Sequence, residues 1–203
     1  MVKDDLIPGQ DGGAQSNTEA SKTFENVAKA QEFFKDVCGR LRHVNRWHDI
    51  AGALSAEFQL TDADGQPVDR PVEKGDYFRI DIPGPGTRAG DGYDWVQVES
   101  VDEVADEEEE ALSIRVRPAP APVNPNPDVA HFFSPEATSC FQVRRQGNHV
   151  IAAVYGRNEK PNTDAGKLVD KARNVAVATG AITGAAKLQW KSLVEGMIGN
   201  RGS

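Results

Sequence analysis

With 203 residues, of which 38% are hydrophobic, this chain is long enough to form one domain with a real core. Its formal net charge of −8 argues against non-specific nucleic-acid binding and against binding to an anionic membrane surface, because no basic stretch offsets phosphate charge. No run of about 18 apolar residues exists, and residues 1–5 lack the apolar core of a signal peptide, so we expect a soluble cytoplasmic protein.

The first 45 residues predict a disordered tail followed by one helix. Residues 1–20 hold Gly, Asp, Gln, Asn and Ser with few large apolar side chains, which is typical of disorder. Ser21 or Thr23 is expected to cap the helix. Apolar residues then recur three and four positions apart and form one stripe: Val27, Ala30, Phe34, Val37, Leu41 and Val44.

Six segments of alternating apolar and polar residues predict strands. The clearest is 76–82, where Phe78, Ile80 and Ile82 share one face while Arg79 and Asp81 share the other. The other strands are expected around Phe58 and Leu60, from Trp95 to Val101, from Leu112 to Arg117, from Ser139 to Arg145 and from His149 to Arg157. Such alternation predicts an antiparallel sheet with one covered face and one polar face.

A second, longer helix is predicted from about Thr163 to Ile198, capped by Asn162, Thr163 or Asp164. Its apolar positions fall on one face: Leu168, Ala172, Val175, Ile182, Ala186, Trp190, Leu193 and Met197. Gly180 and Gly184 each cost about 1 kcal/mol in a helix interior, so the helix is expected to bend there or to approach another backbone closely.

Together these elements predict an α+β fold. Residues 21–198 would form a single domain with an N-terminal helix, a curved antiparallel sheet of about six strands, and a long C-terminal helix packed on one face. Residues 199–203 would be a second disordered tail.

No segment carries a motif for catalysis, a cofactor or a metal. The glycine-rich loop 83–93 leads into a strand rather than a helix N-terminus, so a plain hairpin loop is favoured over a phosphate site. Gly65 is misplaced for a calcium loop built on Asp62 and Asp64. The histidines are scattered, and Cys38 and Cys140 are expected to be small buried apolar residues. We therefore expect no metal and no cofactor.

The order helix, antiparallel sheet, long C-terminal helix resembles the helix-grip fold of the START-like (SRPBCC) superfamily. The resemblance covers roughly residues 22–198 and includes the glycines of the final helix, Gly180 and Gly184. It implies a curved sheet that grips the C-terminal helix around an apolar cavity, and it carries no catalytic residue onto this chain. One departure is that the superfamily fold opens with a strand before its first helices, whereas no strand is predicted before Thr23.

Three functions are compatible with these features. The first is binding of a small apolar ligand between the sheet and the C-terminal helix, at Phe78, Ile80, Phe141, Ile182 and Trp190. The alternative is a protein-interaction or assembly module, which would use the polar sheet face, the Pro-rich segment 118–127 and the acidic run 102–110. A weaker alternative is an enzyme, which requires Arg79, Asp81, Glu99 and Arg144 to converge in a cavity rather than lie on the open face.

Overall fold

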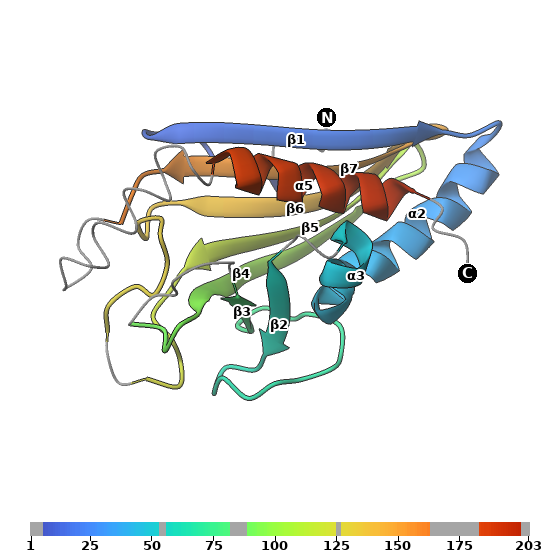
Figure 1. Ribbon diagram of the computed structural model, residues 1–203. Coiled ribbons are helices and arrows are strands. Elements are labelled where there is room, and N and C mark those ends of the chain that lie inside the picture. The colour runs from blue at the N-terminus through green and yellow to red at the C-terminus, as the bar shows by residue number, and fades with distance from the viewer. Residues whose placement is uncertain (1–5, 53–55, 82–88, 125–126, 163–182, 200–203) are drawn as a thin grey trace.

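The computed structural model describes residues 6–52, 56–81, 89–124, 127–162 and 183–199 (Figure 1), and it has the predicted α+β architecture. Its elements are β1 (Ala14–Thr23), α2 (Val27–Arg42), η1 (Val44–Arg46), α3 (Trp47–Ala51), β2 (Glu57–Thr61), β3 (Tyr77–Asp81), β4 (Asp94–Ala105), β5 (Glu109–Pro118), β6 (Thr138–Gln146), β7 (His149–Glu159) and α5 (Thr183–Ile198).

The strands form one antiparallel sheet of seven strands in the order β1-β7-β6-β5-β4-β3-β2. From β2 to β7 each strand pairs with its neighbour in sequence, and β1 pairs with β7, which joins the beginning of the chain to its later part. A register shift between Val98 and Ser100 in β4 is a bulge, and bulges bend a strand and increase its twist. Figure 1 shows the helices gathered on one side of this sheet.

The predicted N-terminal tail is wrong for residues 14–20, because these residues belong to β1. The segment pairs residue by residue with β7, for example Thr18 with Val154 and Ser21 with Ile151. It lacks large apolar side chains, so no alternation revealed it. Its strand conformation depends on hydrogen bonds to a partner strand that lies far away in sequence. The prediction that residues 21–198 form a single domain stays a prediction.

Helix α2 begins later than expected. Its N-cap is Asn26, whose side-chain oxygen accepts a hydrogen bond from the backbone N–H of Lys29 at 2.9 Å. Ser21 and Thr23, the predicted caps, are instead residues of β1, and Thr23 is its last residue. The apolar stripe is confirmed at Ala30, Phe34, Val37 and Leu41, which are buried together with Phe33. At its two ends it is not: Val27 is 43% exposed, and Val44 is buried but belongs to η1.

The main core lies between the helices and one face of the sheet, which we call the inner face. Its strand residues are Phe58, Leu60, Phe78, Ile80, Val96, Val98, Leu112, Ile114, Val116, Phe141, Val143, Val150, Ala152 and Val154. Helix α5 packs along β1 and β7 and against α3 and buries Leu193, Val194, Met197 and Ile198. The predicted first half of the C-terminal helix, 163–182, lies outside the described residues, as do Gly180 and Ile182.

The opposite, outer face was expected to be polar, and this is only partly correct. Trp95 is buried there beside Ala121 and Ala130, which belong to the connection between β5 and β6. A second small cluster joins Cys140, Ala153 and Tyr155 to Ile7 of the N-terminal segment. Irregular segments that cross the sheet therefore cover part of this face.

Within the part of the chain that the structure describes, no helix has both the length and the apolar composition needed to cross a bilayer.

Candidate functional site

Five aromatic side chains from five elements meet on the inner face, and we call them the aromatic cluster: Trp47, Phe58, Phe78, Phe141 and Trp190. Trp47 occupies the centre. Its ring centroid lies 4.7 Å from that of Phe141, 5.4 Å from Phe58 and 5.6 Å from Phe78. These separations and the tilted or edge-on angles are those at which aromatic rings attract one another.

The position of Trp47 follows from the short turn between α2 and α3. The 3₁₀ segment η1 reverses the chain, and Trp47 is the first residue of α3. Its indole N–H donates to the carbonyl oxygen of Leu41 in the last turn of α2 at 3.2 Å. The side chain is fully buried, so this hydrogen bond satisfies both its own polar atom and a helix-terminal carbonyl.

Trp190 closes the cluster from the side of α5. Its ring lies 5.3 Å from that of Phe141 and 6.0 Å from that of Phe58, and the second value is the widest ring contact of the cluster. Trp190 is only partly buried, and Phe58 and its cross-strand partner Ile80 each keep 8% of their surface exposed. The cluster therefore reaches the surface at the end formed by Phe58, Ile80 and Trp190.

The structure brings together most of the predicted site residues. Phe78, Phe141 and Trp190 belong to the aromatic cluster, and Ile80 lies beside Phe58, whereas Ile182 lies outside the described residues. Trp47 and Phe58 were not included in the predicted site. The alternation around Phe58 already indicated that it faces the core, but nothing in the sequence placed Trp47 at the centre.

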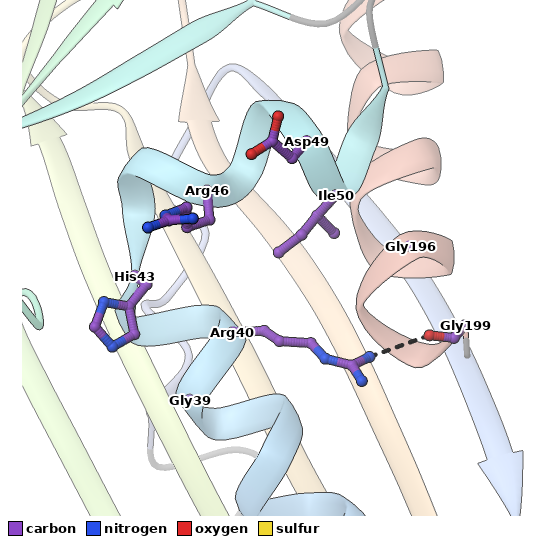
Figure 2. Close-up of a pocket in the computed structure, with 8 residues that line it drawn as sticks. All are labelled: Gly39, Arg40, His43, Arg46, Asp49, Ile50, Gly196 and Gly199. Carbon is purple, nitrogen blue, oxygen red and sulfur yellow. Dashed lines mark hydrogen bonds between the residues drawn. The ribbon is translucent and has the colours of Figure 1, made fainter. Parts of the chain in front are cut away.

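A separate pocket of about 570 Å³ lies where α2, α3 and α5 meet (Figure 2). The side chains of Arg40, His43, Arg46, Asp49 and Ile50 line it, together with Gly39, Gly196 and Gly199. Arg40 donates from Nη1 to the carbonyl oxygens of Met197 at 2.7 Å and Gly199 at 3.1 Å.

The charges around this pocket are balanced by the two helix ends that point into it. Helices α2 and α5 both finish here, and the C-terminal end of a helix carries a partial negative charge. Arg40 compensates that charge at the end of α5. We therefore assign Arg40 a role in stabilising this helix end.

The four charged residues that an enzymatic site requires lie on the outer face. Arg79 stacks on the ring of Tyr93 at 4.6 Å and is paired in the sheet with Trp95, which is an outer-face residue. Glu99 binds Arg115 and Arg117 of the neighbouring strand. Cross-strand ion pairing explains these groups. Asp81 follows the inner-face residue Ile80 and Arg144 follows the inner-face residue Val143, so alternation points both to the outer face, and the four groups do not converge in the inner core.

The two thiols are poor nucleophiles at neutral pH. Burial raises the pKa of the Cys38 thiol from 9.0 to about 12, against a smaller lowering by Arg42. Burial also raises the pKa of Cys140, whose sulfur lies 3.0 Å from the hydroxyl of Ser113. Both cysteines are free. Because the thiolate is the reactive form, these shifts indicate packing roles.

Comparison with known proteins defines the fold and no more. No family model matches the chain, and no curated protein matches it. A hypothetical protein from Helicobacter pylori superposes with a TM-score of 0.51 at 12% identity, covering 96% of this chain and 90% of that one. Norcoclaurine synthase from Thalictrum flavum gives 0.40 at 10% identity over 94% and 95%. Major latex-like protein 151 from Panax ginseng gives 0.34 at 13% identity over 82% and 94%.

The class defined by these observations is an α+β protein with the helix-grip arrangement, in which a curved antiparallel sheet holds a C-terminal helix on its inner face. Membership of the START-like superfamily stays a prediction, because the structural likeness is at low identity and no family model matches.

Proposed function

We propose that this protein binds a small apolar molecule between the inner face of the sheet and α5, at the end of the aromatic cluster formed by Phe58, Ile80 and Trp190. The observation that carries the proposal is the position of Trp190. This side chain is partly exposed, yet it forms part of the same cluster as the fully buried Trp47.

The chemistry of these side chains selects the class of ligand. Phe58 and Trp190 are aromatic and Ile80 is aliphatic, so a bound molecule gains by removing apolar surface from water, at about 25 cal/mol per Å². Two aromatic faces set at 41° to one another favour a flat ring over a flexible chain, because stacked and edge-on ring contacts add to the gain from burial.

The ligand must make its space at Trp190 rather than at Trp47. The rings around Trp47 are close, and its indole N–H is bonded to Leu41. The centroids of the Trp190 and Phe58 rings are 6.0 Å apart, the largest separation among the ring contacts of the cluster. Because Trp190 is only partly buried whereas Trp47 is fully buried, we expect the ligand to displace Trp190 and to lie between Phe58 and Trp190.

Energy transfer from tryptophan to N-phenylnaphthylamine, a neutral apolar fluorophore, tests this proposal. The chain has three tryptophans, and Trp95 lies on the outer face. We expect saturable transfer in the Trp95→Phe variant, which keeps Trp47 and Trp190. We expect the Trp190→Phe variant to bind the probe more weakly by about three- to tenfold, the effect of weakening one or two ring contacts.

The Trp95→Phe variant is also the matched control, because it removes an indole from the opposite face without touching the aromatic cluster. Probe binding that is absent in the natural protein, or equal in both variants, contradicts the proposed site.

The second candidate, an interaction or assembly module, now depends mainly on the acidic hairpin between β4 and β5. Its side chains Asp106, Glu107 and Glu108 are exposed. The Pro-rich segment is a weaker candidate surface, since Ala119 and Ala121 are buried against the sheet. Light scattering after gel filtration, with and without a lysine-rich peptide, tests this candidate; a monomer that binds no peptide contradicts it.

A further inference from the structure

The C-terminal half of α5 is fixed to α2 and α3 by two contacts that involve main-chain atoms. The first is at Gly196, which faces the backbone of α3. A β-carbon at position 196 would lie 2.1 Å from the carbonyl oxygen of Ile50 and 2.9 Å from its Cγ2 atom. Only a residue without a side chain allows this approach, so Gly196 sets the distance between α5 and α3.

The second contact is made by Arg40 of α2. Its Nη1 donates to the carbonyl oxygens of Met197 and Gly199 at the end of α5, as Figure 2 shows for Gly199. The guanidinium also lies 5.7 Å from the centre of the Phe33 ring, which holds it in place. A cation at a helix C-terminus stabilises that end, so Arg40 both orients α5 and caps it.

These contacts act on the ligand site because α5 is one continuous helix from Thr183 to Ile198. Trp190 precedes Gly196 by six residues, which is about 9 Å along a helix axis. In the last two turns of α5, the side chains of Leu193, Val194 and Met197 are buried in the core. Leu188, on the other side of Trp190, is 67% exposed. The position of Trp190 therefore depends on how the last two turns are held.

We propose that Gly196 and Arg40 are positioning residues for the apolar-ligand site: they fix α5 against α3 and α2 and thereby set the gap between Trp190 and Phe58. This inference rests on the proposed function for its consequence on binding, but its structural part is independent of any ligand. Replacement of Gly196 by Ala forces α5 to move from α3 by about 1 Å, because real β-carbon contacts are not found below 3.0 Å.

The chain offers a matched control for each residue. Gly39 lines the same pocket and lies within α2, but a β-carbon there would meet nothing within 4 Å. Arg42 lies in the last turn of α2 like Arg40, but it pairs with Glu103 of β4 rather than with α5. The comparisons are therefore Gly196→Ala against Gly39→Ala, and Arg40→Gln against Arg42→Gln.

The experiment uses the full chain carrying Trp95→Phe, so that emission comes from Trp47 and Trp190. We expect Gly196→Ala and Arg40→Gln to shift the tryptophan emission maximum to longer wavelength, because Trp190 becomes more exposed. They should also weaken N-phenylnaphthylamine binding by about three- to tenfold, as expected for loosened ring contacts. Gly39→Ala and Arg42→Gln should change neither quantity. Circular dichroism well below the melting temperature verifies that each variant is folded.

The emission of the ligand-free protein separates this inference from the proposed function. If the background protein binds no probe but Gly196→Ala still shifts the emission, the positioning role holds and the proposed ligand class fails. If Gly196→Ala and Arg40→Gln give the emission and the affinity of their controls, the positioning role is overturned. Should Gly196→Ala not fold, the Arg40→Gln and Arg42→Gln pair decides by the same two readouts.

Discussion

The two faces of the sheet are covered in different ways. Helices α2, α3 and α5 cover the inner face and share with it one continuous apolar core. Irregular segments cover the outer face over two small patches, around Trp95 and around Tyr155. A helix satisfies its own backbone hydrogen bonds, so it can present an apolar stripe to a sheet. An irregular segment has to bond its backbone elsewhere, as Ala119 and Ala130 do with the main chain of Trp95.

Two buried polar residues, one on each face, differ in their hydrogen bonding. Arg145 is paired with Val150 of the inner core, and its guanidinium donates to the Glu110 carboxylate, to the carbonyl oxygens of Glu107 and Glu108 in the β4–β5 hairpin, and to that of Gly147 in the β6–β7 turn. Gln142 is paired with Ser113 and Ala153 on the outer face, and neither atom of its buried amide has a hydrogen-bond partner among the residues that the structure describes. These two positions therefore differ in how well the buried polar group is paired.

Trp47→Ala should lower the stability of the protein more than any other substitution considered below. We expect a loss of about 3–5 kcal/mol in the free energy of unfolding, since the change empties the centre of the aromatic cluster and leaves the Leu41 carbonyl without its donor. Trp95→Ala on the outer face should cost at least about 1 kcal/mol less, because its neighbours are mostly small and can collapse or admit water. Urea unfolding followed by circular dichroism measures both; equal losses would contradict the difference between the faces.

Substitutions of Arg145 and Gln142 compare a buried polar side chain that is hydrogen-bonded with one that is not. We expect a loss of about 3 kcal/mol, because the Glu110 carboxylate and the hairpin carbonyls lose their donors in a buried setting. Gln142→Met should instead be neutral or stabilise by about 1 kcal/mol, since it removes a buried amide that finds no partner in the described part of the chain. The same urea titrations apply. A Gln142→Met loss as large as that of Arg145→Gln would show that the outer face is paired as fully as the inner one.

Alkaline pH should weaken the folded state through Cys38 on α2. Its thiol pKa is raised by burial from 9.0 to about 12, so the unfolded chain loses this proton at a lower pH than the folded one. Stability that is present below pH 9 should therefore fall as the pH rises from 9 toward 12. Cys38→Ala should make that decline in stability shallower. A part of the decline should remain, because burial also raises the pKa of the outer-face Tyr155. An unchanged slope would contradict the assignment.

Much of the inner face could be predicted from the sequence. The alternation at Phe78 and Ile80, at Val96 and Val98, and at Leu112, Ile114 and Val116 gave the correct buried side of these strands. The middle of the α2 stripe is buried, and four of the five predicted site residues lie in or against the apolar core, at Phe78, Ile80, Phe141 and Trp190. Periodicity is a local property of the chain, so it is visible without knowledge of what covers it.

The remaining features depend on contacts between distant segments. The polar segment 14–23 forms strand β1 because it pairs with β7. Trp47 lies at the centre of the aromatic cluster because it follows η1, which links α2 to α3. Trp95 is buried because the β5–β6 connection packs on it. The sequence by itself determined which side of each apolar element is buried, because that information lies in the spacing of its side chains. Only the tertiary structure decided which elements meet, and that Gly196 brings α5 onto the backbone of α3, because such contacts join residues that no local pattern connects.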